Sequence, residues 1–328
     1  MARLNASIAL CVLAIATGCG GRDDGPVRPG SAESGAAACS DGRDNDADGF
    51  IDCSDGDCAT QPSCRTDGGI MTDAGPARDF GPPRDLGPPI MCTGPIDLVF
   101  VLDVSTSMTD EVGRVRTGLR SIADAARALT ADTNFSLVVF VDDAVAEASC
   151  APFASIDALE AAFDRWQSFC SSNRQPAGGG DDTNSDCAEN SLDAIYLAAN
   201  TCPWRTDATR ILIHVTDDTF AERPAVLSGS PFGGGGIPVQ RTYDEVVTEL
   251  RRAEVRVGAF AAPGAGEECG AGMSANVGEG FHEPYRGRDS LPVATGGQVW
   301  SIRDVRAGTL DMATAINEMV SSEYCTLY

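Results

Sequence analysis

The chain has 328 residues and a formal net charge of −24, and all of its 24 Lys-plus-Arg residues are arginine. Nucleic acids and anionic membrane surfaces would repel so acidic a protein, so neither is an expected partner. The lack of lysine also excludes a Walker-type phosphate loop and Schiff-base catalysis, because both depend on a lysine amine.

Residues 1–18 have the features of a signal peptide, since Arg3 precedes a short apolar segment and small residues follow it. The apolar segment is too short to span a membrane. The four residues that end at Cys19, Ala-Thr-Gly-Cys, resemble the lipobox of bacterial lipoproteins, which implies that Cys19 becomes the lipidated N-terminus. Gly20 stands where lipoproteins retained in the inner membrane often carry Asp. We therefore expect a lipid-anchored protein of the bacterial cell envelope that contacts the membrane only through its anchor. The outer membrane is the expected location, where the protein can be exposed on the cell surface.

Two segments lack the periodicity of folded structure. Residues 19–38 are rich in Gly, Ala, Pro, Ser and charged residues, which predicts a flexible tether after the lipidated cysteine. Residues 65–91 loosely repeat Asp-x-Gly-Pro motifs with paired prolines, which favour extended polyproline conformation. We expect this second segment to be a stiff spacer in front of the next domain.

Between these segments, residues 39–64 alternate acidic residues with single spacers and contain four cysteines. The aspartates that reproduce the spacing of an EF-hand loop, with Asp at its last position, are Asp44, Asp46, Asp48, Asp52 and Asp55. Because no amphipathic helix flanks them, the segment resembles the disulfide-laced aspartate repeats of thrombospondin type 3 more than a helical EF-hand. We predict a small Ca²⁺-binding module; the alternative is a solvated acidic run.

The 13 cysteines of an exported chain favour disulfides. Removal of Cys11 with the signal and lipidation of Cys19 would leave 11 (13 minus 2), so at least one thiol is free or pairs outside the chain. We expect the cysteines of the acidic module to pair among themselves, and a bridge between the ends of the large domain is plausible. The cysteines concerned are Cys39, Cys53, Cys58 and Cys64 in the module, and Cys92 and Cys325 at the domain ends.

From residue 92 to residue 328 the sequence alternates strands with amphipathic helices. Apolar runs and β-branched residues predict strands at 98–102, 135–141, 211–215, 255–259 and 298–302. Apolar residues three and four positions apart predict helices over 112–129, 156–166, 192–199, 246–250 and 310–320. Ser155 and Thr242 are placed to cap two of these helices. The alternation predicts an α/β domain with a doubly wound, mostly parallel sheet that helices cover on both faces.

The strand at 98–102 leads directly into a group of oxygen-bearing side chains. These are Asp103, Ser105, Ser107, Asp110 and Glu111. Hard divalent cations prefer such ligands, although Ser and Asp are also favoured as helix caps, and spacing alone leaves both readings open. Asp217 follows another predicted strand, and ligands of doubly wound sheets bind at the carboxyl ends of the strands. We therefore expect Asp103 and Asp217 to lie close together.

The spacing Asp103-x-Ser105-x-Ser107 after a hydrophobic strand resembles the metal-ion-dependent adhesion site of von Willebrand factor A domains. This resemblance implies that Ser105, Ser107 and Glu189 bind a central Mg²⁺ or Mn²⁺ directly, while Asp103 and Asp217 hold it through water. Most A domains use Thr at the third direct position. The sequence around Glu189 is similar instead to the A-type domain of integrin β subunits, which uses Glu.

The resemblance to integrin β covers about residues 95–324 and implies two flanking Ca²⁺ sites. The adjacent site would be formed by Asp110 and Glu111, where integrins carry Asp in place of this Glu. The second flanking site would share Glu189 with the central site. Its other side chains are implied to be Asp142, Asn184 and Asp186.

Two neutral hydroxyls and one carboxylate would leave the central ion electrophilic and with an open coordination position. The resemblance implies that an Asp or Glu carboxylate exposed on a protein ligand completes the shell, and that the loop at 150–186 selects this ligand. The cation would reverse the local field, so that an acidic protein can hold an acidic partner. The alternative from another class is a Ca²⁺-stabilised structural scaffold of the envelope without an exchangeable ligand.

No enzymatic activity is predicted. His214 lies within an apolar run and is expected in the core, and with His282 it offers no convincing Ser-His-Asp, Cys-His or His-Glu-x-x-His arrangement. Phosphatases of the haloacid dehalogenase type need a second Asp two residues after the first, where this chain has Ser105.

Overall fold

The computed structural model describes residues 38–40, 58, 93–184, 188–228, 235–269, 273–324 and 326. The chain divides into two units, Met1–Asp85 and Leu86–Tyr328. The described part of the first unit contains a short 3-10 helix, η1 (Ala38–Ser40), and a disulfide between Cys39 and Cys58. Cys19, the five aspartates of the predicted Ca²⁺ module and the predicted Cys92–Cys325 pair lie outside the described residues.

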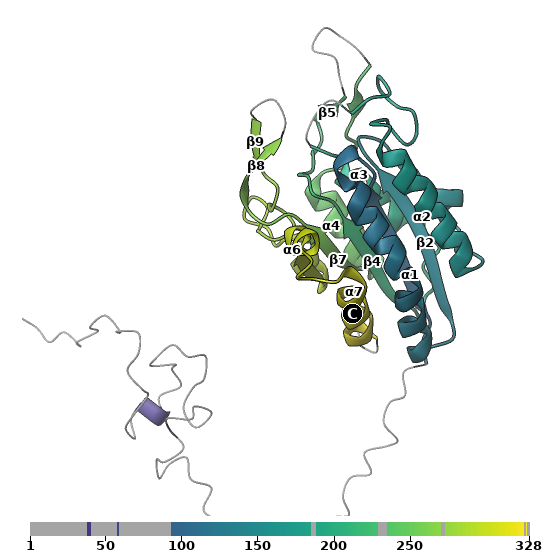
Figure 1. Ribbon diagram of the computed structural model, residues 1–328. Coiled ribbons are helices and arrows are strands. Elements are labelled where there is room, and N and C mark those ends of the chain that lie inside the picture. The colour runs from purple at the N-terminus through teal and green to yellow at the C-terminus, as the bar shows by residue number, and fades with distance from the viewer. Residues whose placement is uncertain are drawn as a thin grey trace, which may run out of the picture. The chain divides into compact units, whose positions relative to one another are not determined.

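The second unit is built on a six-stranded sheet with the order β10-β7-β4-β1-β2-β3 (Figure 1). The strands are β1 (Ile96–Asp103), β2 (Thr133–Phe140), β3 (Ala144–Ala146), β4 (Thr209–Val215), β7 (Arg256–Ala261) and β10 (Gln298–Ser301). All neighbouring pairs are parallel except β2 and β3. This order is that of a doubly wound sheet, so the predicted fold class is confirmed.

Helices cover both faces of the sheet (Figure 1). On one face α1 (Thr109–Leu129) contacts both α2 (Ile156–Cys170) and α7 (Met312–Glu323). On the other face lie α3 (Ser191–Thr201), α4 (Tyr243–Arg252) and the short α5 (Leu291–Thr295). Successive residues of β1 point to opposite faces: Phe100 packs in the core under α1, whereas Val101 packs in the core under α3. The unbroken apolar run of β1 is therefore explained by burial on both sides.

The predicted caps are present. The Ser155 side chain accepts a hydrogen bond from Ala158 N at the start of α2, and Thr242 and Glu245 form a reciprocal capping box at the start of α4. Two helices were not predicted: the short α5, and α6 (Ile302–Ala307), which follows β10 directly and begins with Ile302, the residue expected to end that strand. Ser301 caps α6, and Gly308 ends it at a φ of 72°, a conformation that glycine adopts without strain.

Four short strands form two separate pairs outside the main sheet. They are β5 (Val226–Leu227) with β6 (Ile237–Pro238), and β8 (Ala265–Cys269) with β9 (Met273–Asn276). Two 3-10 helices, η4 (Thr106–Met108) and η5 (Glu147–Cys150), follow β1 and β3. Across the residues that the structure describes, no helix is both long enough and apolar enough to cross a bilayer.

A second disulfide joins Cys150, at the end of η5, to Cys202, just after α3, while Cys170 is a buried free thiol in α2. His214 in β4 is fully buried between the rings of Phe140 and Phe281, with centroid distances of 5.4 and 5.1 Å. Burial lowers the pKa of His214 to about 3, so it is a neutral core residue, as predicted.

Candidate metal centre

Asp103 stands at the end of β1 and is fully buried. Its carboxylate accepts hydrogen bonds from Ser105 N at 2.8 Å and from Thr216 Oγ1 at 2.7 Å. Thr216 follows β4, the parallel neighbour of β1, so the two strand ends meet at one edge as predicted. Burial, and then the charge of Asp217, raise the pKa of Asp103 to about 7. The negative charge of the buried Asp103 carboxylate therefore destabilises the fold unless a cation lies near it.

The two predicted serines lie beside this carboxylate. The Oγ atoms of Ser105 and Ser107 are 3.2 Å apart, and Ser107 Oγ donates to Asp217 Oδ1 at 2.9 Å. Carboxylate oxygens of Asp103, Asp217 and Asp218 all lie within 4.8 Å of one another. Three negative charges so close repel strongly unless a proton or a cation offsets them. The donor set, hard oxygens from hydroxyls and carboxylates, fits Mg²⁺ or Mn²⁺.

Glu189 is buried just before α3, and its backbone is fixed by hydrogen bonds to the segment after β4, from Glu189 N to Thr219 O and from Ala221 N to Glu189 O. Its Oε1 accepts from Asn184 Nδ2 at 2.9 Å, while its Oε2 has no hydrogen-bond partner among the described residues. Burial, and then the charges of Asp103, Asp142 and Asp218, raise the pKa of Glu189 well above its usual value. An oxygen buried without a donor beside other carboxylates is suited to a cation.

On the second flanking side, Asp142 is buried at the end of β2, and its Oδ2 accepts from Gln175 Nε2 at 2.7 Å and from the Ser228 hydroxyl. The Oδ1 of Asn184 is also buried without a hydrogen-bond partner in the part of the chain that is described. The structure thus brings Asp142, Asn184 and Glu189, three of the predicted ligands, together. Asn184 donates a hydrogen bond to Glu189, and the charge of Asp142 contributes to the raised pKa of Glu189. Asp186 lies outside the described residues.

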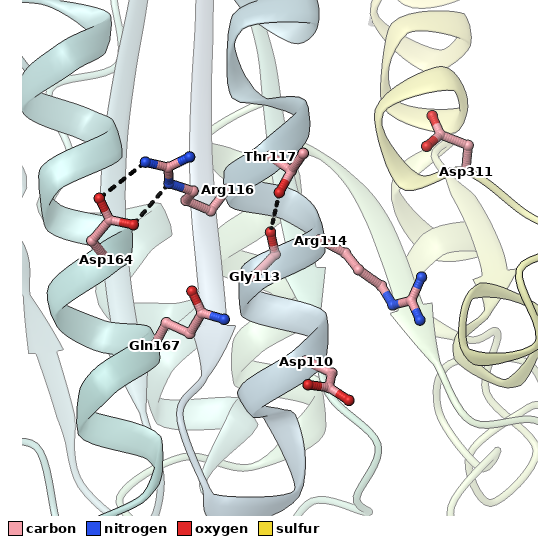
Figure 2. A pocket seen from close by; sticks show the side chains of 8 residues that line it. All are labelled: Asp110, Gly113, Arg114, Arg116, Thr117, Asp164, Gln167 and Asp311. Carbon is pink, nitrogen blue, oxygen red and sulfur yellow. Dashed lines mark hydrogen bonds and ion pairs between the residues drawn. The ribbon is translucent and has the colours of Figure 1, made fainter.

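On the other flank, the two predicted ligands of α1 have different surroundings. Asp110 is exposed and lines a surface cavity together with Arg114, which extends from the same helix (Figure 2). Glu111 is buried, and its Oε1 accepts from Arg306 Nε at 2.6 Å. Burial disfavours the charged guanidinium, but hydrogen bonds to Glu111 and Asp217 outweigh this and raise the pKa of Arg306 above its usual value.

Three residues of this region were not predicted as functional. Asp218 had a signal, because it adjoins Asp217 at the end of the same strand. Gln175 and Arg306 had none: the first lies in a loop after α2 and the second in the unpredicted helix α6, and neither has a recognisable spacing from the metal motif.

No family model matches the chain. It is 27% identical to integrin beta-5 of Mus musculus and to integrin beta-5 of Bos taurus over 162 residues, which cover 43% of this chain and 19% of each relative. The chain therefore spans less than a fifth of the length of these curated relatives.

Among solved structures, the chain is similar to an aerotolerance-related membrane protein of Bacteroides fragilis NCTC 9343, with 12% identity and a TM-score of 0.44. That similarity covers 69% of this chain and 99% of the other. It is also similar to the conserved hypothetical protein BatB of Bacteroides thetaiotaomicron, with 13% identity, a TM-score of 0.42 and coverage of 70% and 100%. The chain is therefore similar in sequence to integrin beta-5 over 162 residues, its described domain has a doubly wound α/β fold, and that domain carries a cluster of three aspartates whose oxygens suit a hard metal ion.

Proposed function

We propose that this protein is a non-enzymatic binding protein that holds a protein ligand through a divalent cation at the carboxyl edge of its sheet. The observation that carries the proposal is the cluster of Asp103, Asp217 and Asp218, whose carboxylate oxygens lie within 4.8 Å of one another beside two serine hydroxyls. When bound, Mg²⁺ or Mn²⁺ would supply a Lewis-acidic position that an Asp or Glu carboxylate of the ligand can enter.

In this proposal some residues bind the ion directly and others bind it through water. Ser105, Ser107 and Glu189 would bind it directly, since they supply two hydroxyls and a buried carboxylate oxygen without a donor. Asp103 and Asp217 would act through water. They also orient the serines, because Asp103 accepts from the backbone N of Ser105 and Asp217 accepts from the hydroxyl of Ser107.

A Ca²⁺ ion at the second flanking site is part of the proposal. Its side chains would be Asp142, Asn184 and Asp186, with Glu189 shared between the two ions. The support is that Asn184 Oδ1 and Glu189 Oε2 are both buried and lack a hydrogen-bond partner among the described residues. Carboxylate and amide oxygens are ordinary Ca²⁺ ligands.

The loop after α2 would present the ligand-selecting surface, and it is fastened to the sheet beside the site. Gln175 Oε1 accepts from the backbone N atoms of Asp142 and Asp143 at 2.8 and 3.1 Å. The Asp143 carboxylate in turn accepts from Ala177 N and Gly179 N at 2.9 and 2.7 Å. A loop fixed in this way can offer a preorganised surface to a partner.

The N-terminal part of the proposal concerns location. A lipid on Cys19 would anchor the mature chain in the bacterial envelope, with the outer membrane as its site. The acidic module with Asp44, Asp46, Asp48, Asp52 and Asp55 would bind Ca²⁺ of its own. Replacement of Cys19 by Ala should shift the protein from the detergent phase to the soluble fraction, and unchanged partitioning would contradict the anchor.

The test of function is calorimetric titration of the full chain with Mg²⁺ and then with a peptide that contains an exposed Asp. Ser105→Ala should abolish Mg²⁺-dependent peptide binding, whereas Ser168→Ala, which removes a hydroxyl from an exposed position of α2, should leave it unchanged. Far-ultraviolet circular dichroism should be the same for both variants. Peptide binding that survives in chelator contradicts the proposal. Cation binding without any peptide binding supports the Ca²⁺-stabilised scaffold instead.

A further inference from the structure

Arg306 brings one positive charge to three oxygen atoms beside the proposed metal centre. Its Nε donates to Glu111 Oε1 at 2.6 Å, and its Nη2 donates to Asp217 Oδ2 at 2.8 Å and to the carbonyl oxygen of Ser107 at 3.5 Å. These groups come from α1, from the segment after β4 and from η4, while Arg306 belongs to α6. The Arg306 side chain therefore joins three parts of the chain that are distant in sequence: α6, the consecutive elements η4 and α1, and the segment after β4.

The oxygens that Arg306 contacts form a set that a divalent cation could otherwise take. Two carboxylates and a backbone carbonyl are typical of Ca²⁺ sites. Glu111 has a side chain only 2% exposed and Asp217 one 13% exposed, so their charges need a counter-ion. The planar guanidinium supplies one positive charge to this pair and one directed hydrogen bond to each carboxylate, from different nitrogens. A divalent cation placed at the same oxygens would be repelled by it.

We propose that Arg306 is a built-in cation that takes the place of a Ca²⁺ ion at the Glu111 side of the metal centre and thereby tunes the affinity of that centre for its own ion. The inference rests on the proposed function, since Asp217 belongs to both groups. Arg306 is a positioning residue: it fixes the orientation of Asp217 and reduces the negative charge that a central cation meets. The exposed Asp110 takes no part in this arrangement.

The position of Arg306 is itself fixed by the fold. Helix α6 begins at the Ser301 cap, where Ser301 Oγ accepts from Asp304 N at 3.2 Å, and it ends at Gly308. The apolar residues Ile302 and Val305 of this short helix are buried, so α6 is held against the core. Because α6 is packed against the core, the backbone of Arg306 has a fixed position beside the proposed metal centre.

The experiment measures Ca²⁺ bound per chain by equilibrium dialysis of the full chain, and Mn²⁺ affinity by electron paramagnetic resonance. Arg306→Gln should bind one more Ca²⁺ than the wild type and should bind Mn²⁺ roughly tenfold more tightly. The double variant R306Q with E111Q should lose the additional Ca²⁺. The control is Arg114→Gln, which removes an equal charge from an exposed position of α1, one turn after Asp110. This variant should match the wild type in both Ca²⁺ count and Mn²⁺ affinity.

A second variant keeps the test decisive if Arg306→Gln does not fold. Asp110→Asn changes an exposed side chain, and the inference expects its Ca²⁺ count to equal that of the wild type. One Ca²⁺ fewer in Asp110→Asn, or no additional Ca²⁺ in folded Arg306→Gln, overturns the inference. Wild-type protein that binds no Mn²⁺ overturns the proposed function itself, so the two failures are distinguishable.

Discussion

The two flanks of the proposed metal centre differ in the charged groups that surround their carboxylates. On the side of α1, Glu111 and Asp217 share the single positive charge of Arg306. On the side of the loop after α2, Glu189 Oε2 and Asn184 Oδ1 are buried without hydrogen-bond partners among the described residues. Glu111 Oε2 is also buried without a hydrogen-bond partner among the described residues, so the difference between the flanks is that the α1 side has a guanidinium beside its carboxylates.

The largest expected effect concerns Asp103 at the centre of the cluster, whose hydrogen-bond donors among the described residues include no guanidinium. Burial raises the pKa of Asp103 from 3.8, the ordinary value of an aspartate, to about 7, so the ionised carboxylate destabilises the metal-free fold most above pH 7. The penalty decreases as the pH falls from 7 towards 4. In chelator at pH 8, Asp103→Asn should be more stable than the wild type, by on the order of 4 kcal/mol.

Urea unfolding of both proteins from pH 8 to pH 4 checks this effect. The stability difference between the two proteins should shrink steadily over that range. The neutral His214 contributes equally to both proteins, so its own acid sensitivity cancels in the difference. If the stability difference does not change with pH, the pKa of Asp103 is not raised in the folded protein.

The next effect is metal removal. If the ions bind only the folded state, each stabilises it by about 2.7 kcal/mol at a free concentration one hundred times its dissociation constant. Addition of chelator should therefore lower the midpoint of thermal unfolding of the wild type. Asp103→Asn should lose part of this response, and an equal response of both proteins would place the stabilising ions elsewhere.

A smaller effect is expected at the flank that contains Asp142. Gln175 is buried, and it donates to Asp142 Oδ2 and accepts from two backbone N atoms. Gln175→Ala removes one of the donors to Asp142 Oδ2 and takes away the acceptor of two backbone N–H groups, so it should cost about 1–3 kcal/mol of stability. The Ca²⁺ affinity of the Gln175→Ala variant should fall, while the contacts of Arg306 with Glu111 and Asp217 should not change. Chemical denaturation with and without Ca²⁺ measures both changes, and an unchanged Ca²⁺ affinity argues against an ion beside Asp142.

The smallest effect is expected away from both flanks. Arg116 of α1 pairs with Asp164 of α2 on the surface shown in Figure 2, with side chains 37% and 53% exposed. Water and salt screen such a pair, so Arg116→Ala should leave metal affinity unchanged and alter stability only slightly. A marked loss of Mn²⁺ binding in this variant would mean that surface charge in general, and not the centre, controls cation uptake.

The sequence predicted the parts of the molecule that have a periodic or local signal. The buried strand β1 followed by Asp103, Ser105 and Ser107 is visible as a run of apolar residues that ends in hydroxyls and a carboxylate. The convergence of Asp103 and Asp217 followed from the rule that parallel strands end at one edge.

What could not be predicted depends on contacts between elements distant in the chain. Arg306 looks like any of 24 arginines in the sequence, and it becomes important only because a six-residue helix carries it to Glu111, 195 residues earlier. A helix of that length shows too little periodicity to be recognised. Gln175 likewise acts only through the packing of its loop against β2.

The most direct measurement is anomalous diffraction from crystals of the full chain grown with Mn²⁺. The account predicts a peak within coordination distance of the hydroxyls of Ser105 and Ser107 and the carboxylate of Glu189, and no peak between Glu111 and Asp217, where Arg306 lies. Mn²⁺ bound elsewhere with the Ser105–Ser107 position empty would contradict the account.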